Sequence, residues 1–187
     1  MLKVDYSNCN TVEELYHTSM YQLSKLYTPD YPSYLPHIRE LLKSCKTYRE
    51  LGTNQGASVS SIILSKPEYI ELVDINFKNY APQQSIVESY AKEHNIDIVM
   101  HEQSSLTVNT DVKTEFLFVD SVHKYAHVKE EIKLYEPLTT RYIMFHDTVG
   151  FPGVGKAVTE FLESTVEWKL YFHLDSKTAG YTIVEKV

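Results

Sequence analysis

The sequence predicts an α/β fold in which one mostly parallel sheet carries helices on both faces. After residue 45, apolar strand-like runs alternate with segments of helical periodicity, which is the pattern of successive βα units. The chain then ends in two strand-like runs, residues 168–174 and 181–187, with only six residues between them. Such a short connection favours an antiparallel hairpin. We therefore expect a seven-stranded sheet that is parallel except at its C-terminal hairpin.

Each expected element follows from a local pattern. Thr11, with acids at Glu13 and Glu14, is typical of a helix N-cap, and a second helix is expected over residues 37–45. The segment 29–36 between these helices holds three prolines and predicts a turn or flap. The remaining strands are expected at residues 46–51, 69–75, 97–101, 116–120 and 141–147, and the remaining helices at residues 57–64, 82–94, 125–135 and 154–163.

Composition limits the classes of protein to consider. With 187 residues, 43% of them hydrophobic, and a net charge of −7, the chain should form one domain over residues 1–187, with 1–45 as an N-terminal helical segment. The acidic balance argues against nucleic acid and against an anionic membrane as partners. Two cysteines make no disulfide framework, and neither a signal peptide nor a membrane span is visible. We expect a cytoplasmic protein, and a homo-oligomer stays open.

The most informative segment is 50–58, Glu-Leu-Gly-Thr-Asn-Gln-Gly-Ala-Ser, in which a strand meets a helix through a turn with two glycines. Glycine lets a ligand approach the backbone, and the following helix begins with unpaired N–H groups. The Walker pattern needs a lysine where this chain has Ala57, and the dinucleotide pattern G-x-G-x-x-G finds only Gly52 and Gly56. An acid-x-Gly-x-x-x-Gly pattern, which begins at Glu50, fits instead.

A carboxylate stands at the end of the next expected strand. Asp74 lies eighteen residues after Gly56 and ends the apolar run 69–74. A strand-terminal acid beside the glycine turn can accept hydrogen bonds from both ribose hydroxyls of an adenosine. The alternative is an ordinary aspartate that caps the next helix. Together with the glycine turn, Asp74 favours an adenosine-containing cofactor.

Two later strands also end in ionisable residues, and ligands bind at the carboxyl ends of strands in open α/β sheets. The patterns are V-D-x-x-H-x-Y-x-x-V over residues 119–128, F-H-D-T over 145–148 and G-V-x-x-A-V over 153–158. With the glycine turn and Asp74, they resemble the motifs of class I S-adenosylmethionine-dependent methyltransferases. The three later patterns resemble the matching motifs of a methyltransferase family that includes macrocin O-methyltransferase-like and cephalosporin-hydroxylase-like proteins.

The resemblance implies a three-layer Rossmann-like methyltransferase fold, S-adenosylmethionine as cofactor, and O-methylation of a small hydroxylated molecule. It implies that acceptor specificity lies in the N-terminal helices, the 29–36 flap and the loop after Thr148. The cofactor contacts that it implies are at the glycine turn and the following strand ends, namely Glu50, Gly52, Gly56, Ser58, Asp74, Ile75, Glu102, Gln103 and Asp120.

Methyl transfer to a hydroxyl requires that the hydroxyl lose a proton, with help from a base or a metal. The catalytic candidates are Asp120, His123 and His146. Relatives that bind a divalent cation have carboxylate or amide ligands at three positions, which are Asp120, His146 and Asp147 in this chain. His146 departs from that pattern. Mg²⁺ prefers oxygen ligands, whereas imidazole suits Mn²⁺ or Zn²⁺, so both a metal ligand and a general base stay open for His146.

Other functions are also compatible with parts of the sequence. A metal-dependent hydroxylase needs a facial triad, which His123, His146 and one of Asp120 or Asp147 supply on paper, but it leaves the glycine turn unexplained. A non-catalytic S-adenosylmethionine-binding protein would be expected to have a broken glycine turn, and this turn is intact. A dinucleotide dehydrogenase would continue βα units where this chain ends in a hairpin.

Overall fold

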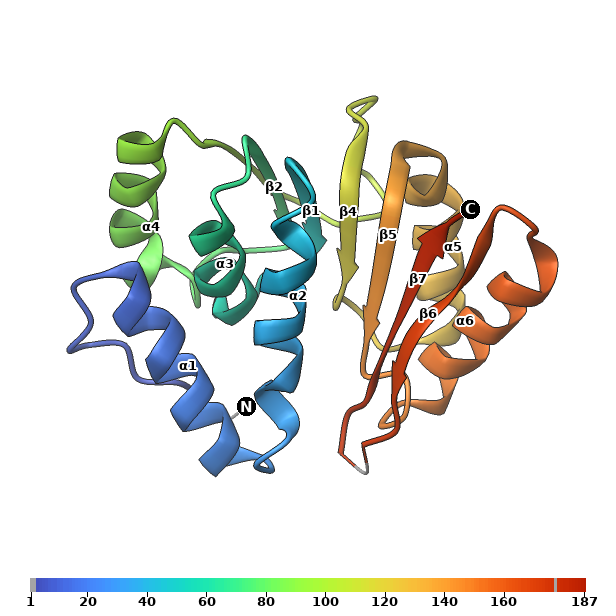
Figure 1. Ribbon diagram of the computed structural model, residues 1–187, viewed down its shortest axis with the longest axis horizontal. Helices are drawn as coiled ribbons and strands as arrows, with labels where there is room; N and C mark the ends of the chain where they lie inside the picture. Colours follow the sequence, from blue (N-terminus) through green and yellow to red (C-terminus); the bar gives the residue numbers. More distant parts are fainter. Residues whose placement is uncertain (1–2, 177) are drawn as a thin grey trace.

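The computed structural model describes residues 3–176 and 178–187. Among these residues one seven-stranded sheet has the strand order β3-β2-β1-β4-β5-β7-β6 (Figure 1). The strands are β1 (Thr47–Leu51), β2 (Tyr69–Asp74), β3 (Asp97–Glu102), β4 (Thr114–Val119), β5 (Thr139–His146), β6 (Trp168–Leu174) and β7 (Tyr181–Lys186). Strands β1 to β5 pair in parallel, while β7 is antiparallel to both β5 and β6. The expected mostly parallel sheet and its C-terminal hairpin are confirmed.

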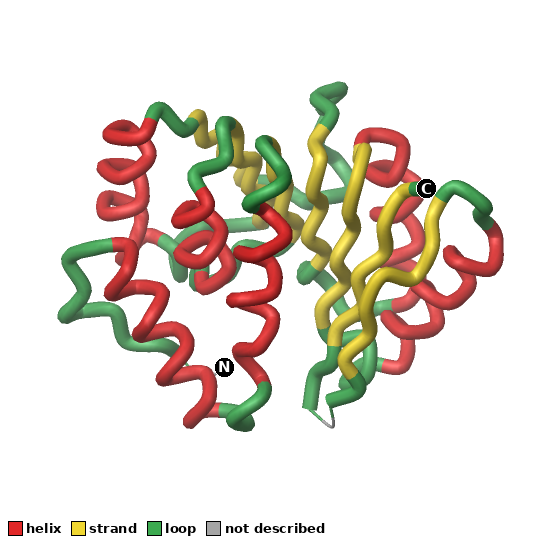
Figure 2. The backbone as a smooth tube through the Cα atoms, viewed as in Figure 1, coloured by secondary structure: helices red, strands yellow, loops and turns green. Residues whose placement is uncertain are grey.

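Helices cover both faces of this sheet (Figure 2). One face carries α1 (Val12–Leu26), α2 (Tyr34–Leu42), α3 (Ala57–Ile62) and α4 (Ala81–His94), and the other carries α5 (Tyr125–Tyr135) and α6 (Pro152–Ser164). The described residues also form the short 3₁₀ helices η1 (Tyr31–Ser33), η2 (Ile63–Ser65) and η3 (Glu136–Leu138). Thr11 and Glu14 form a capping box at the start of α1. Helix α2 begins at Tyr34, three residues before the expected start, because Pro36 is tolerated in a first helical turn.

Alternation along the strands sends side chains into two separate cores. In β1, Tyr48 packs in the core under α1 to α4, whereas Leu51 packs in the core under α5 and α6. Arg49 lies on the α5 face as well, with its guanidinium over the ring of Tyr135. Successive side chains of a strand point to opposite faces, and a parallel sheet with helices on both sides is buried on both. This layering leaves the carboxyl ends of the strands as the place where loops gather.

The connection from β3 to β4 differs from the other parallel crossovers. It runs through residues 103–113, and within the part of the chain that the structure describes it is the one parallel crossover that contains no helix. Beneath it, Arg49 and Glu71 form an ion pair with both side chains fully buried. The start of this connection, Gln103 to Ser105, contributes to the cavity described below. None of the described helices combines the length and apolar character that a bilayer crossing demands.

Candidate active site

A cavity of about 680 Å³ opens at the carboxyl ends of the parallel strands. Its walls include Gly52 after β1, residues 74–76 at the end of β2, residues 103–105 after β3, residues 120–123 after β4 and Asp147 after β5. Five loops that are far apart in the sequence therefore meet there, as expected for an open α/β sheet. Of the predicted cofactor contacts, Gly52, Asp74, Ile75, Gln103 and Asp120 line this cavity.

The glycine turn after β1 requires its glycines. Gly52 and Gly56 have φ values of 93° and 71°, which residues with a side chain rarely adopt. A Cβ at Gly52 would also collide with the backbone of Asp120, so the lack of a side chain lets the end of β1 pack against the end of β4. A substitution at Gly52 would therefore disturb the strand ends as well as any ligand.

Glu50, the acid at the start of the glycine turn, stabilises the turn through buried hydrogen bonds. Glu50 is fully buried and accepts hydrogen bonds from Tyr48 Oη at 2.5 Å and Ser58 Oγ at 2.8 Å. Burial raises the pKa of Glu50 to about 8. Of the predicted cofactor contacts, Glu50, Gly56, Ser58 and Glu102 lie outside the lining of the cavity. Glu50 and Ser58 thus tie the strand to the first turn of α3.

Asp74 is oriented by two backbone groups. Its Oδ2 accepts a hydrogen bond from the N–H of Asn54 at 2.8 Å, and its Oδ1 accepts one from the N–H of Asn76 at 3.1 Å. A carboxylate has about four lone-pair positions, so both oxygens can accept further bonds. Two exposed apolar residues, Ile75 and Val122, lie in the same cavity lining. This part of the cavity therefore combines an oriented hydrogen-bond acceptor, the Asp74 carboxylate, with apolar walls.

Four ionisable side chains cluster at the ends of β4 and β5, and three of them, Asp120, His123 and Asp147, line the cavity. His123 Nε2 lies 3.2 Å from Asp120 Oδ1 and 3.1 Å from Asp147 Oδ2. His146 Nδ1 lies 3.5 Å from both Asp120 Oδ1 and Asp147 Oδ1, which is an ion-pair distance without hydrogen-bond geometry. The histidines differ in access, because the His123 side chain is 31% exposed and that of His146 is only 2% exposed. The strand ends thus bring the three predicted catalytic residues together.

The charges in this cluster stabilise one another. Burial alone would raise the pKa of Asp120, but the imidazoles of His146 and His123 lower it to about 2. Burial alone would lower the pKa of His146, but the carboxylates of Asp120 and Asp147 raise it to about 10. The hydrogen bond to Asp120 raises the pKa of His123. At neutral pH the cluster therefore holds an Asp120 carboxylate beside a His146 imidazolium.

Local geometry holds the cluster in place. Asp147 has φ 60°, a left-handed conformation that few residues other than glycine adopt, and such strain occurs preferentially at functional sites. The His146 ring packs edge-on against Tyr34, with ring centroids 4.5 Å apart, and against Tyr31, at 5.6 Å. Tyr31 comes from the predicted 29–36 flap, so this N-terminal segment packs onto the strand ends.

The predicted metal ligands fit a cation by geometry and donor type. Ligand atoms of Asp120, His146 and Asp147 all lie within 4.8 Å of one another. His146 Nδ1 is buried and has no hydrogen-bond partner among the described residues. Because buried polar atoms normally have a partner, this nitrogen is a candidate metal ligand. Two carboxylates and an imidazole suit Mn²⁺ or Zn²⁺ better than Mg²⁺. An imidazolium between two carboxylates satisfies the same geometry.

Several cavity residues were not singled out from the sequence. Tyr27, Tyr31 and Phe151 contribute aromatic surface, and Tyr27 and Tyr31 stack with ring centroids 4.2 Å apart. Their segments were expected to face the acceptor, but no pattern distinguished these aromatics from core residues. Ser105 and His127 also line the cavity. The available signal for His127 was its helical spacing of four from Glu131.

No protein-family model and no curated protein matches the chain. Solved structures share its fold. The O-methyltransferase TomG of Streptomyces achromogenes, involved in tomaymycin synthesis and solved with S-adenosylmethionine, has a TM-score of 0.64 at 13% identity, over 97% of this chain and 93% of that chain. An O-methyltransferase of Bacillus cereus, solved with S-adenosylhomocysteine, has a TM-score of 0.63 at 13% identity, over 94% and 90%.

Proteins with a different type of acceptor share the fold too. A ribosomal-protein methylase of Lactobacillus delbrueckii has a TM-score of 0.56 at 14% identity, over 80% of this chain and 76% of that chain. The fold is therefore the Rossmann-like class I methyltransferase fold that the sequence motifs implied. It does not by itself select an acceptor.

Proposed function

We propose that the protein is an S-adenosylmethionine-dependent methyltransferase that methylates a hydroxyl group of a small molecule. The proposal rests on the lining of one cavity. This lining includes both the oriented Asp74 carboxylate and the cluster of Asp120, His123 and Asp147. The first part suits an adenosine ribose, and the second suits deprotonation of an acceptor. The fold shared with the two O-methyltransferases supports this assignment.

Asp74 would bind the ribose, because its remaining lone pairs can accept two hydroxyl groups. Ile75 and Val122 would pack on the faces of the adenine ring. When bound, S-adenosylmethionine supplies a methyl group on a positively charged sulfur. The negatively charged oxygens of Asp120 at the same cavity favour that positive charge.

The acceptor hydroxyl needs a group that takes its proton. His123 is the better candidate, because its side chain is partly exposed to the cavity whereas that of His146 is almost fully buried. Asp120 and Asp147 hold the His123 ring between them and favour the protonated form that results from proton transfer. His146, which is buried, then stabilises both carboxylates through its positive charge.

Asp120, His146 and Asp147 would hold a divalent cation, and such a cation would lower the pKa of the acceptor hydroxyl. The aromatic surface of Tyr27, Tyr31 and Phe151 suits an acceptor with apolar or planar parts. Cation assistance and base catalysis by His123 are compatible with each other. A cation would displace the imidazolium proton of His146, so metal binding should release protons.

The test is calorimetric titration of the chelator-treated protein with S-adenosylmethionine and S-adenosylhomocysteine, repeated with Mg²⁺, Mn²⁺ or Zn²⁺. We expect both ligands to bind with one-to-one stoichiometry. A rise in affinity with one cation would support a bound metal, and equal affinity in chelator would show that cofactor binding needs no cation. If the folded protein binds neither ligand under any of these conditions, the proposed function is wrong.

A further inference from the structure

One buried carboxylate oxygen connects three residues of the cavity wall. Glu131 in α5 is fully buried, and its Oε1 accepts hydrogen bonds from Ser105 Oγ and Ser121 Oγ, each at 2.5 Å. His127 Nε2 lies 3.3 Å from the same oxygen. Ser105 follows β3, Ser121 follows β4 and His127 is in α5, and all three line the cavity. We call these three residues the α5 wall.

Proton counting fixes how the α5 wall is arranged. Ser105 has one hydroxyl proton, and it is donated to Glu131. The contact of 3.1 Å between Ser105 Oγ and His127 Nε2 must therefore use a proton on Nε2. In neutral His127 this leaves Nδ1 as an acceptor. The α5 wall thus has a fixed set of donors and acceptors instead of freely rotating hydroxyls.

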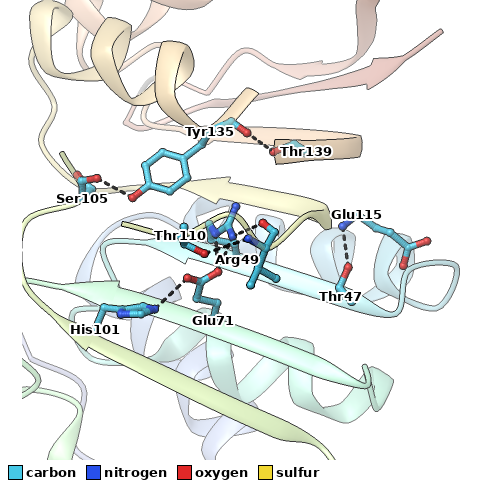
Figure 3. Close-up of polar contacts among 10 residues, drawn as sticks. Thr47, Arg49, Glu71, His101, Ser105, Thr110, Glu115, Tyr135 and Thr139 are labelled. Carbon is cyan, nitrogen blue, oxygen red and sulfur yellow. Dashed lines mark hydrogen bonds and ion pairs between the residues drawn. The ribbon is translucent and has the colours of Figure 1, made fainter. Parts of the chain in front are cut away.

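The connection that carries Ser105 is also held by side chains of α5 and β1 (Figure 3). Tyr135 Oη donates a hydrogen bond to the Ser105 carbonyl at 2.6 Å, and Arg49 Nη2 donates one to the Val112 carbonyl at 2.7 Å. Residues 127, 131 and 135 recur every four positions, so one face of α5 faces this connection. Because the connection has no helix of its own, these side chains supply the support that a helix would otherwise give.

We propose that Glu131 is a positioning residue that holds the α5 wall in the geometry needed to recognise the base of the cofactor. The inference rests on the proposed function, in which the ribose lies at Asp74 and the adenine lies between Ile75 and Val122. The polar edge of the adenine then meets the α5 wall. Glu131 itself does not line the cavity and acts through Ser105, Ser121 and His127.

Two substitutions of Glu131 test whether Oε1, as a hydrogen-bond acceptor, is the part of the side chain that matters. Glu131→Leu removes all three contacts to Oε1. Glu131→Gln retains Oε1, and its amide nitrogen takes the place of Oε2, which has no hydrogen-bond partner among the described residues. Glu130→Gln is the matched control, because Glu130 is an exposed neighbour in the same helix. The folding of each variant is checked by thermal unfolding.

The probes are S-adenosylhomocysteine and its inosine analogue, in which an oxo group replaces the adenine amine, both measured by calorimetry. The wild type should prefer the adenine ligand. Glu131→Leu should bind it about tenfold more weakly or worse and lose most of the preference, while Glu131→Gln and Glu130→Gln should stay within about threefold of the wild type.

A wild-type protein without a preference, or an equal loss for both ligands in Glu131→Leu, would overturn the inference, since a general loss of structure weakens both alike. If Glu131→Leu does not fold, Tyr135→Phe removes only the bond to the Ser105 carbonyl and should reduce the preference in the same direction. An unchanged preference in that variant would also overturn the inference. Failure of the wild type to bind either ligand would instead refute the proposed function.

Discussion

Replacement of Asp74 by alanine should weaken binding of S-adenosylhomocysteine without unfolding the protein. Asp74 lies at the end of β2 and lines the cavity, and its carboxylate accepts hydrogen bonds from two backbone N–H groups. The loss of a hydrogen bond to a charged group typically costs about 1.5–3 kcal/mol. That corresponds to an affinity lowered roughly tenfold to a hundredfold.

The structure identifies a side effect that the experiment must separate. Asp74→Ala also leaves the N–H groups of Asn54 and Asn76 without their acceptor, so part of the loss would come from a rearranged turn. Asp74→Asn keeps one side-chain oxygen and should lose less affinity than Asp74→Ala. Asp97→Ala is the control, because Asp97 is an exposed aspartate at the opposite end of the strands.

Calorimetry with S-adenosylhomocysteine, at a temperature well below the unfolding transition of each variant, gives the four affinities. The expected order is wild type and Asp97→Ala first, then Asp74→Asn, then Asp74→Ala. Unchanged affinity in folded Asp74→Ala would refute the ribose assignment.

Three further outcomes follow from buried groups. Arg49→Met should lower the free energy of unfolding in urea by about 3–5 kcal/mol, because it leaves buried Glu71 without its cation; addition of Glu71→Leu should restore most of the loss, and an additive double variant would contradict this. Burial raises the pKa of Glu50 from 4.5 to about 8, so the folded protein holds a proton that the unfolded chain loses, and the free energy of unfolding should fall as the pH rises across that range. The fall should be smaller in Glu50→Gln, and identical slopes would argue against the raised pKa. Chelator-treated protein should bind Mn²⁺ or Zn²⁺ more tightly than Mg²⁺, and Asp147→Asn should weaken this binding; equal metal affinities of the variant and the wild type would exclude Asp147 as a ligand.

Local patterns in the sequence were sufficient for the sheet and for part of the site. The βα alternation predicted the parallel strands, and the short connection near the C-terminus predicted the hairpin of β6 and β7, now confirmed. Asp74, Asp120 and Asp147 were recognisable because each follows an apolar strand, and parallel strands end at the same edge of a sheet. These features depend on residues that are neighbours in the chain.

Other features depend on contacts between distant segments, and no local pattern contains them. Glu50 has the spacing of a cofactor contact, but strand alternation and the packing of Tyr48 and Ser58 direct its carboxylate beneath the turn. His123 follows β4 and His146 is the last residue of β5. Of the two, only His123 lines the cavity, because Tyr31 and Tyr34 pack against the ring of His146.

The α5 wall is the clearest case of a feature that only the tertiary structure decided. Its three members come from separate segments, and the strand order brings the end of β4 and the helix-free connection after β3 to the same face of α5. A buried carboxylate such as Glu131 is stable only where several donors converge on it. That convergence is set by the path of the backbone through the sheet, so the sequence determined the kinds of groups available and the fold determined which of them meet.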